Sequence, residues 1–276
     1  MEKAFEELGI HIPSILLPEQ NVDLNKWCVV ACDQYTSQPD YWGKVEELVG
    51  EDPSTLHLVF PEVYLEDGDG EKRIEKIAEN MRNYLHDGTL VPLKPGFILV
   101  VRDTSRGHRR PGLMVALDLD MYSYEEQSQT IIRATEGTVI ERIPPRLKIR
   151  EKARVELPHI MVLIDDPKKT VIEPLLDDID EGDKVYDTQL MMDGGTVKGY
   201  AVNDETSLKK IYGALKKLAD PEAFRDKYNV GPEKGLLLYA MGDGNHSLAT
   251  AKAHWEALKV TLNEKERAHH PARYTL

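Results

Sequence analysis

Residues 235–258 read GLLLYAMGDGNHSLATAKAHWEAL, and this stretch is the most informative about the fold. Every residue from Leu236 to Met241 is apolar, which is typical of a central strand covered on both faces. A helical pattern with Leu248, Trp255 and Leu258 on one face follows the polar turn directly. A strand that runs straight into a helix favours a domain that mixes helices and strands in packed layers.

The polar turn between this strand and helix suits the binding of an anion. It consists of Gly242, Asp243, Gly244, Asn245, His246 and Ser247. Glycines let a ligand approach the backbone closely, and the free N–H groups of a first helical turn attract negative charge. Asp243 would stand at the carboxyl end of the strand, where sheets of this kind bind ligands. An ordinary turn, in which Gly and Asn serve backbone geometry alone, explains the same residues equally well.

Two familiar phosphate loops do not match this turn. A Walker A loop needs Lys followed by Ser or Thr after its last Gly, and Asn-His follows Gly244 here. The dinucleotide fingerprint needs a third Gly where this chain has Ser247.

Alternating apolar runs and helical periods along the rest of the chain predict an α+β (mixed α/β) fold. We expect strands at residues 27–32, 97–102, 113–119, 159–164, 184–192, 199–202 and 236–241. We expect helices after Gln38, after Gly70, after Asp204–Thr206, and after Asn245. Residues 1–276 form one large unit or two intimately packed ones, with no clear boundary. Residues 272–276 resemble the opening of a strand, so we expect the natural chain to continue.

Composition and charge exclude several classes of protein. The 276 residues contain 35 Lys and Arg against 48 Asp and Glu, a net charge of −13, with 41% hydrophobic residues. Such a chain is globular, and no basic stripe is present that would neutralise a nucleic-acid backbone. No apolar stretch approaches the ~18 residues of a membrane span, and the acidic start does not resemble a signal peptide. We therefore expect a cytoplasmic protein that binds neither nucleic acid nor membrane.

Two cysteines and one acidic loop are interpreted as structural. Cys28 and Cys32 would lie roughly 13 Å apart along the expected strand, too far for a disulfide, and we expect buried, reduced thiols. No zinc-type spacing of Cys or His occurs. The acidic loop at residues 177–183 lacks a calcium-binding pattern and is interpreted as a solvated turn.

Two further segments have polar side chains that could serve a ligand. In residues 133–151, RATEGTVIERIPPRLKIRE, Pro144 and Pro145 suit the first turn of a helix, and Arg146 and Arg150 then share a face. Guanidinium groups hold phosphate oxygens in pairs, although a solvated, salt-bridged helix start is the simpler interpretation of the residues alone. In residues 29–42, the polar side chains follow the expected strand: Asp33, Gln34, Tyr35, Thr36 and Ser37. They could line a pocket or form turns and helix caps.

With these segments taken together, the chain resembles domain-of-unknown-function family 1015. The resemblance runs over essentially the whole chain and rests on AFEELGIHIPSILLP, KWCVVACDQYTSQPDYW, PSTLHLVFPEVYL, IRATEGTVIERIPPRLKIRE, LPHIMVLIDD and GDGNHSLATAK. That family is similar to the ParB/sulfiredoxin-like superfamily, which includes free-serine kinases and has a mixed sheet flanked by helices. Members of family 1015 continue beyond the segment that matches residues 269–276, HHPARYTL.

The superfamily resemblance implies roles for particular residues. Its Asp-Gly-His-His-Arg-like loop, which meets nucleotide phosphates, matches residues 243–247, with Asn245 in place of the first His and Ser247 in place of the Arg. Because this chain lacks the Arg of that loop, Arg142 or Arg146 would bind the phosphate in its place. Its His-Glu-x-Thr stretch is similar to residues 135–138, without the His.

The resemblance implies phosphoryl transfer between a nucleotide, ATP or ADP, and a small hydroxylated metabolite such as serine, or removal of phosphate from phosphoserine. Asp243 would be the base or a Mg²⁺ ligand, with Glu136 as the second carboxylate at the metal. Phosphate would be held by Gly242, Gly244, Asn245, His246 and Ser247 with Arg142 and Arg146, and residues 33–36 with Thr138 would line the substrate pocket. The alternative is a binding module that senses a nucleotide or phosphometabolite without turnover. We expect Asp33, Glu136, Arg142, Asp243 and His246 to converge on one cleft.

Overall fold

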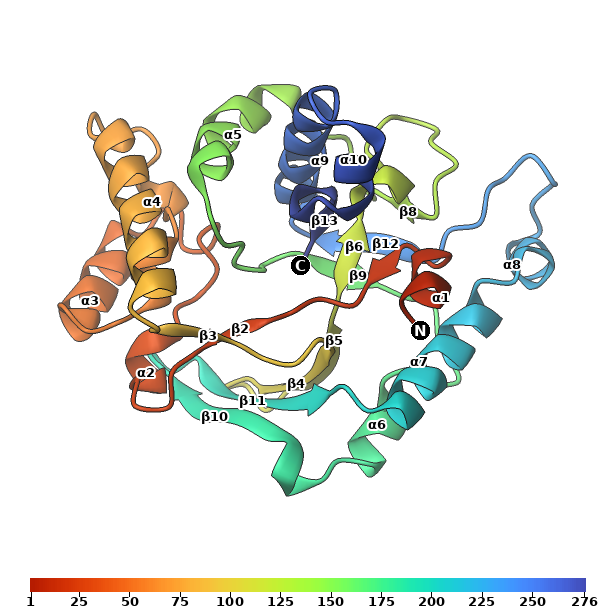
Figure 1. The fold of residues 1–276 in the computed structure, drawn as a ribbon, viewed down its shortest axis with the longest axis horizontal. Helices are drawn as coiled ribbons and strands as arrows, with labels where there is room; N and C mark the ends of the chain where they lie inside the picture. Colours follow the sequence, from red (N-terminus) through yellow and green to blue (C-terminus); the bar gives the residue numbers. More distant parts are fainter.

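The computed structural model describes all 276 residues and has an α+β fold (Figure 1). One antiparallel sheet of four strands lies at the bottom of the view in the order β10-β11-β4-β5. Its strands are β4 (Phe97–Asp103), β5 (Arg109–Met114), β10 (Lys184–Leu190) and β11 (Gly195–Val202). Strand β4 is interior, and its first three residues are buried, as expected for the run FILVV.

A second sheet of four strands has the order β7-β8-β12-β9 and mixes parallel and antiparallel pairs. Strand β8 pairs in parallel with both β7 and β12, whereas β9 pairs antiparallel with β12. Its strands are β7 (Tyr122–Ser123), β8 (Ile132–Arg133), β9 (Met161–Leu163) and β12 (Tyr239–Asp243). The fold is completed by β1 (Ile10–His11), β6 (Ala116–Asp118) and β13 (Tyr274–Thr275) in one small sheet, and by β2 (Leu16–Pro18) with β3 (Leu90–Pro92).

Ten α-helices surround these sheets, and the four expected from the sequence are confirmed. The helices are α1 (Glu2–Glu6), α2 (Leu24–Trp27), α3 (Pro39–Val49), α4 (Gly70–His86), α5 (Ile143–Lys152), α6 (Glu173–Asp177), α7 (Glu205–Leu218), α8 (Pro221–Tyr228), α9 (Asn245–Lys259) and α10 (Glu264–His269). A proline occupies the first turn of α3, α5 and α8, where its missing N–H costs no hydrogen bond. None of these helices is long and apolar enough to cross a lipid bilayer.

The main hydrophobic core packs α9 and α7 against β4, β11 and β12. It contains 25 buried residues, with Trp255 of α9 and Ile211 of α7 almost completely inaccessible to solvent. A smaller cluster of 7 residues joins Trp27 to the inner face of α4, and a third surrounds Trp42 of α3. The periodic residues of α4, α7 and α9 that the sequence assigned to the core are buried there, apart from a few at the edge.

The strand expected at residues 27–32 is wrong. Trp27 ends the short helix α2, which Asp23 caps, and residues 28–32 have no regular structure. Loop side chains bind the backbone where this segment begins: Ser54 Oγ donates to Lys26 O at 2.7 Å, Thr55 Oγ1 donates to Trp27 O at 2.6 Å, and the Val29 N–H donates to Thr55 Oγ1 at 3.4 Å. Local apolar composition therefore did not determine the backbone here.

Other strands are shifted or divided. The strand expected at 113–119 is two strands, β5 and β6, with a break at Val115. Strand β12 begins three residues later than expected and includes Gly242 and Asp243.

Cys28 and Cys32 are free, as expected, but only half-buried. The acidic loop contains the end of α6 and a short helical turn at Glu181–Asp183.

Candidate functional site

Parallel pairing of β8 with β12 brings two distant segments of the chain together. Tyr239 lies beside Ile132 and Ala240 beside Arg133, so both strands end at the same edge of the sheet. Thr135 Oγ1 then donates to Met241 O at 2.7 Å. Because the carboxyl ends of parallel strands meet at one edge, the segments that follow β8 and β12 form a candidate site there.

A hydrogen bond between Glu136 and Asn245 lies at the centre of this site. Asn245 Nδ2 donates to Glu136 Oε1 at 3.2 Å across 109 residues of sequence. Asn245 is only 6% exposed, whereas Glu136 is exposed. The sequence-based assignment of Glu136 and Asn245 to one site is therefore consistent with their positions.

The glycines of the turn have a structural role of their own. Gly244 has a φ of 82°, and a Cβ atom on it would lie 3.1 Å from Ile160 Cα. A Cβ atom on Gly242 would lie 3.1 Å from Leu163 Cγ. Close packing of β12 against the β9 region thus requires small residues at both positions, whatever ligand is bound.

The start of α9 has polar groups that are available to a ligand. No side chain caps this helix, and Asp243 Oδ1 accepts the Gly244 N–H at 2.8 Å. Asn245 Oδ1 is buried without a hydrogen-bond partner, and so is Thr138 Oγ1. A buried polar atom without a partner is costly, so a ligand that donates to Asn245 Oδ1, or a cation, would stabilise this arrangement.

His246 is held as a neutral imidazole beside two arginines. Its Nε2 accepts the Val139 N–H at 3.2 Å, which requires an unprotonated nitrogen at that position. Burial lowers the pKa of His246, and the positive charges of Arg142 and Arg146 lower this pKa further. In this arrangement His246 accepts a backbone hydrogen bond, and the lowered pKa favours the neutral imidazole over the cationic one near neutral pH.

The two candidate phosphate-binding arginines differ in availability. Arg146 donates from Nε and Nη2 to Glu62 Oε1, at 2.9 and 2.5 Å, and from Nη1 to Arg142 O. Arg142 is exposed, and its guanidinium group makes no hydrogen bond or ion pair. Arg142 is thus free to bind an anion, whereas Arg146 would first have to leave Glu62.

The expected substrate-pocket loop contacts this site only indirectly. Gln34, Tyr35 and Thr36 are exposed, and Tyr35 stacks on Tyr41 with ring centroids 3.8 Å apart. Asp33 accepts a hydrogen bond only from its neighbour Gln34. The link to the site is made by Cys32, whose carbonyl accepts the Glu62 N–H at 2.8 Å. The loop therefore reaches the site through Glu62 and Arg146.

No group of three or more His, Cys, Asp or Glu side chains is arranged to hold a metal ion alone. Asp243 and Glu136 each use one carboxylate oxygen in the hydrogen bonds above, which leaves Asp243 Oδ2 and Glu136 Oε2 free. Magnesium is often held by one or two carboxylates together with substrate phosphates and water, so these two free oxygens are the candidate ligands for such an ion.

A large cavity of about 990 Å³ opens beside the start of α9. Most of its lining is apolar, and its polar lining includes Arg146, Glu62, His159 and Ser247. Ser247 Oγ lies 2.6 Å from His159 Nε2. The other candidate residues that we expected to share one cleft do not line this cavity: Asp33, Glu136, Arg142, Asp243 and His246. The sequence analysis gave Glu62 and His159 no role, although both lie in segments that carry the family resemblance, PSTLHLVFPEVYL and LPHIMVLIDD.

The family model described as "Protein of unknown function (DUF1015)" matches residues 16–276. The chain belongs to the DUF1015 family. No curated protein and no solved structure matches this chain. Because the description of DUF1015 states no activity, the function has to be argued from the geometry of the site.

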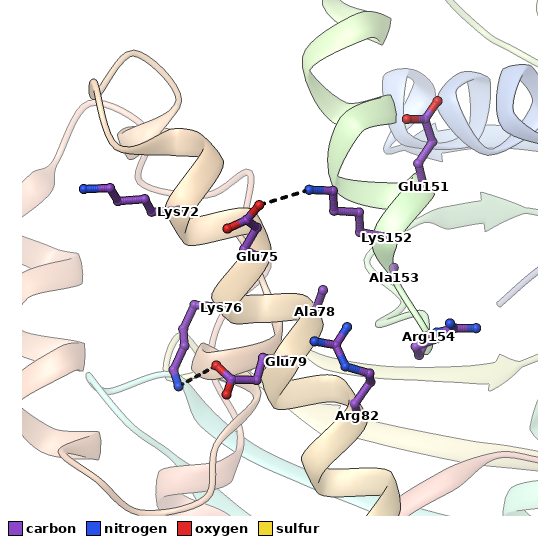
Figure 2. Close-up of a pocket in the computed structure, with 10 residues that line it drawn as sticks. All are labelled: Lys72, Glu75, Lys76, Ala78, Glu79, Arg82, Glu151, Lys152, Ala153 and Arg154. Carbon is purple, nitrogen blue, oxygen red and sulfur yellow. Dashed lines mark hydrogen bonds and ion pairs between the residues drawn. The ribbon is translucent and has the colours of Figure 1, made fainter.

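A second hollow, of about 840 Å³, lies between α4 and the end of α5 (Figure 2). Figure 2 shows its ion pairs, in which Lys76 Nζ lies 2.9 Å from Glu79 and Lys152 Nζ lies 3.6 Å from Glu75. Its charged side chains are exposed and its lining is almost entirely polar. Exposed ion pairs contribute little to stability or recognition, so we interpret this hollow as solvated surface.

Proposed function

We propose that this protein transfers a phosphoryl group between a nucleotide and a small hydroxylated metabolite, with serine and phosphoserine as the first candidates. The observation that carries the proposal is the hydrogen bond from Asn245 to Glu136, which joins a carboxylate to the uncapped start of α9. Phosphoryl transfer needs positioned carboxylates, phosphate-binding N–H groups and positive charge close together.

In the reaction, the metabolite hydroxyl oxygen attacks the terminal phosphorus, the bond to the leaving phosphate oxygen breaks, and the hydroxyl proton passes to a carboxylate. Asp243 and Glu136 would divide two tasks: one would accept this proton, and the other would hold Mg²⁺ through its free oxygen. Bound magnesium would neutralise phosphate charge at this site. The N–H groups of residues 244–247 and Arg142 bind the phosphates.

The unpartnered polar atoms support a hydroxylated substrate. Asn245 Oδ1 can accept a hydrogen bond from a hydroxyl or amino group, and Thr138 Oγ1 can donate or accept one.

We also propose that this sheet and helix form a ParB/sulfiredoxin-like core. The parallel β8–β12 pair and the turn into α9 support this proposal.

The test combines turnover with binding. L-serine is incubated with Mg²⁺ and ATP or ADP, and phosphoserine is followed by ³¹P NMR, with phosphoserine hydrolysis as the reverse arm. We expect Asp243→Asn and Glu136→Gln each to lower kcat by at least about 100-fold. Glu141→Gln is the matched control, since Glu141 is an exposed carboxylate of the same segment with no hydrogen-bond partner.

Calorimetry separates the alternatives. The wild type and Asp243→Asn could bind nucleotide equally well and both form no product. That result would show that the protein is a sensor module and not an enzyme. A ligand at 100 times Kd should raise the free energy of unfolding by ~2.7 kcal/mol. Absence of both product and binding, with either nucleotide and with Mg²⁺ present, would refute the proposal.

A further inference from the structure

Ser247 and His159 form a close pair at the wall of the large cavity. Ser247 Oγ lies 2.6 Å from His159 Nε2, although 88 residues separate them in the sequence. Ser247 stands in the first turn of α9, and His159 precedes β9, which pairs with β12. Both residues are half-buried and both line the cavity. The turn that places the backbone of Ser247 at the candidate phosphate site thus brings its hydroxyl to a histidine.

The second nitrogen of His159 favours one direction for this hydrogen bond. His159 Nδ1 lies 3.3 Å from Leu157 O. A carbonyl oxygen can only accept, so the tautomer with its proton on Nδ1 donates to Leu157 O and leaves Nε2 to accept from the Ser247 hydroxyl. A serine that donates to a histidine whose other nitrogen is held by an acceptor has the arrangement of an activated nucleophile and its base.

The cavity determines the class of substrate that could reach this pair. Its volume of about 990 Å³ suits a small organic molecule, and 26 of its 42 lining residues are hydrophobic. An uncharged carboxylic ester with an apolar acyl chain matches such a lining, because its chain would be buried against apolar side chains. Four arginines also line the cavity, Arg102, Arg146, Arg150 and Arg154, of which Arg146 and Arg150 are paired with Glu62 and Glu156.

We propose that Ser247 and His159 form a nucleophile–base pair that hydrolyses carboxylic esters bound in this cavity. Ser247 Oγ attacks the ester carbonyl carbon while His159 Nε2 takes the hydroxyl proton, and the C–O bond to the alcohol breaks as His159 returns that proton to the leaving oxygen. Water then attacks the acyl–serine ester, giving up its proton to His159, and the acid leaves as Ser247 regains a proton. Water is the only co-reactant. This activity does not depend on phosphoryl transfer.

Covalent labelling tests the nucleophile without any variant. The intact protein is treated with an alkyl fluorophosphonate, which a nucleophilic serine attacks with loss of fluoride, and the modified peptide is identified by mass spectrometry. We expect one adduct per chain, on Ser247. No adduct on the folded wild-type protein, or an adduct only on other peptides, overturns the proposal.

Ester hydrolysis tests the pair as a unit. With p-nitrophenyl butyrate as substrate, we expect Ser247→Ala and His159→Gln each to lower kcat/KM by at least about 100-fold, with circular dichroism confirming the fold. Ser14→Ala is the matched control, since Ser14 lines the same cavity and its hydroxyl donates to Leu93 O instead of a histidine. The proposal is overturned if Ser247→Ala hydrolyses the ester as fast as the wild type does. It is also overturned if the wild type hydrolyses the ester no faster than buffer alone.

Discussion

Arg146 of α5 donates from Nε and Nη2 to a single oxygen of Glu62, at 2.9 and 2.5 Å. Both side chains are 17% exposed, so the pair is largely shielded from water. Glu62 also donates its N–H to Cys32 O, and Arg146 donates to Arg142 O. The pair therefore fastens the irregular segment that contains Cys32 to the helix beside the candidate phosphate site.

Breaking this ion pair should destabilise the protein. Glu62→Gln removes the negative charge and leaves the shielded guanidinium group without its counter-charge, so we expect the free energy of unfolding to fall by about 2 kcal/mol. Urea denaturation followed by fluorescence measures this change. Lys209→Met is the control, because the exposed Lys209–Glu205 pair should be worth no more than about 0.5 kcal/mol. Equal effects of the two variants would show that shielding of the Glu62–Arg146 pair has no energetic consequence.

The buried carboxylate of Asp118 should depend strongly on Arg273. Arg273 donates from Nε and Nη2 to the two oxygens of Asp118, at 3.0 and 2.6 Å, and the Asp118 side chain is 2% exposed. Arg273→Met leaves a buried charge without its partner, and we expect a loss of about 3–5 kcal/mol in the free energy of unfolding. The double variant with Asp118→Asn should recover part of that loss in a double-mutant cycle. Additive losses would contradict this account.

The pKa of His246 should respond to Arg142. Burial is the first cause of its lowered pKa, and the positive charges of Arg142 and Arg146 follow. As pH falls below about 6.5, the unfolded chain takes up a proton at His246 before the folded chain does, so the free energy of unfolding declines as pH decreases.

Arg142→Gln removes one of these charges and should raise the pKa of His246, which an NMR titration of the imidazole measures. Arg82→Gln is the control, because Arg82 lies on α4 in the hollow of Figure 2 and is not among the charges that act on His246. A His246 pKa that is the same in both variants would rule out the assigned electrostatic cause.

The two cysteines should react slowly with thiol reagents while the protein is folded. Burial raises the pKa of Cys28 to about 11, and burial together with Asp33 and Glu62 raises the pKa of Cys32 to about 12. Because the thiolate is the reactive form, we expect modification by iodoacetamide at pH 7.4 to be at least about 100-fold slower than in urea. Rapid labelling of both cysteines in the folded protein would disprove the shielding of residues 28–32.

The sequence by itself determined helices α3, α4, α7 and α9 and the buried strand β4 of this protein. Apolar periodicity predicted helices α4, α7 and α9, because each is long enough for its one apolar face to be recognised. The apolar run Phe97–Val101 predicted a strand that is covered on both faces. The change from strand to helix near Gly244 was also predicted, although Gly242 and Asp243 belong to β12 and residues 245–247 belong to α9.

Only the tertiary structure decided which distant side chains meet. Parallel pairing of β8 with β12 brings Glu136 to Asn245, and antiparallel pairing of β9 with β12 brings the His159 segment to Ser247. Residues 28–32 looked like a strand locally, yet Ser54 and Thr55 satisfy the carbonyl groups that precede them. The side-chain contacts named here join residues 28 to 109 positions apart, and local pattern contains no information about partners at such separations.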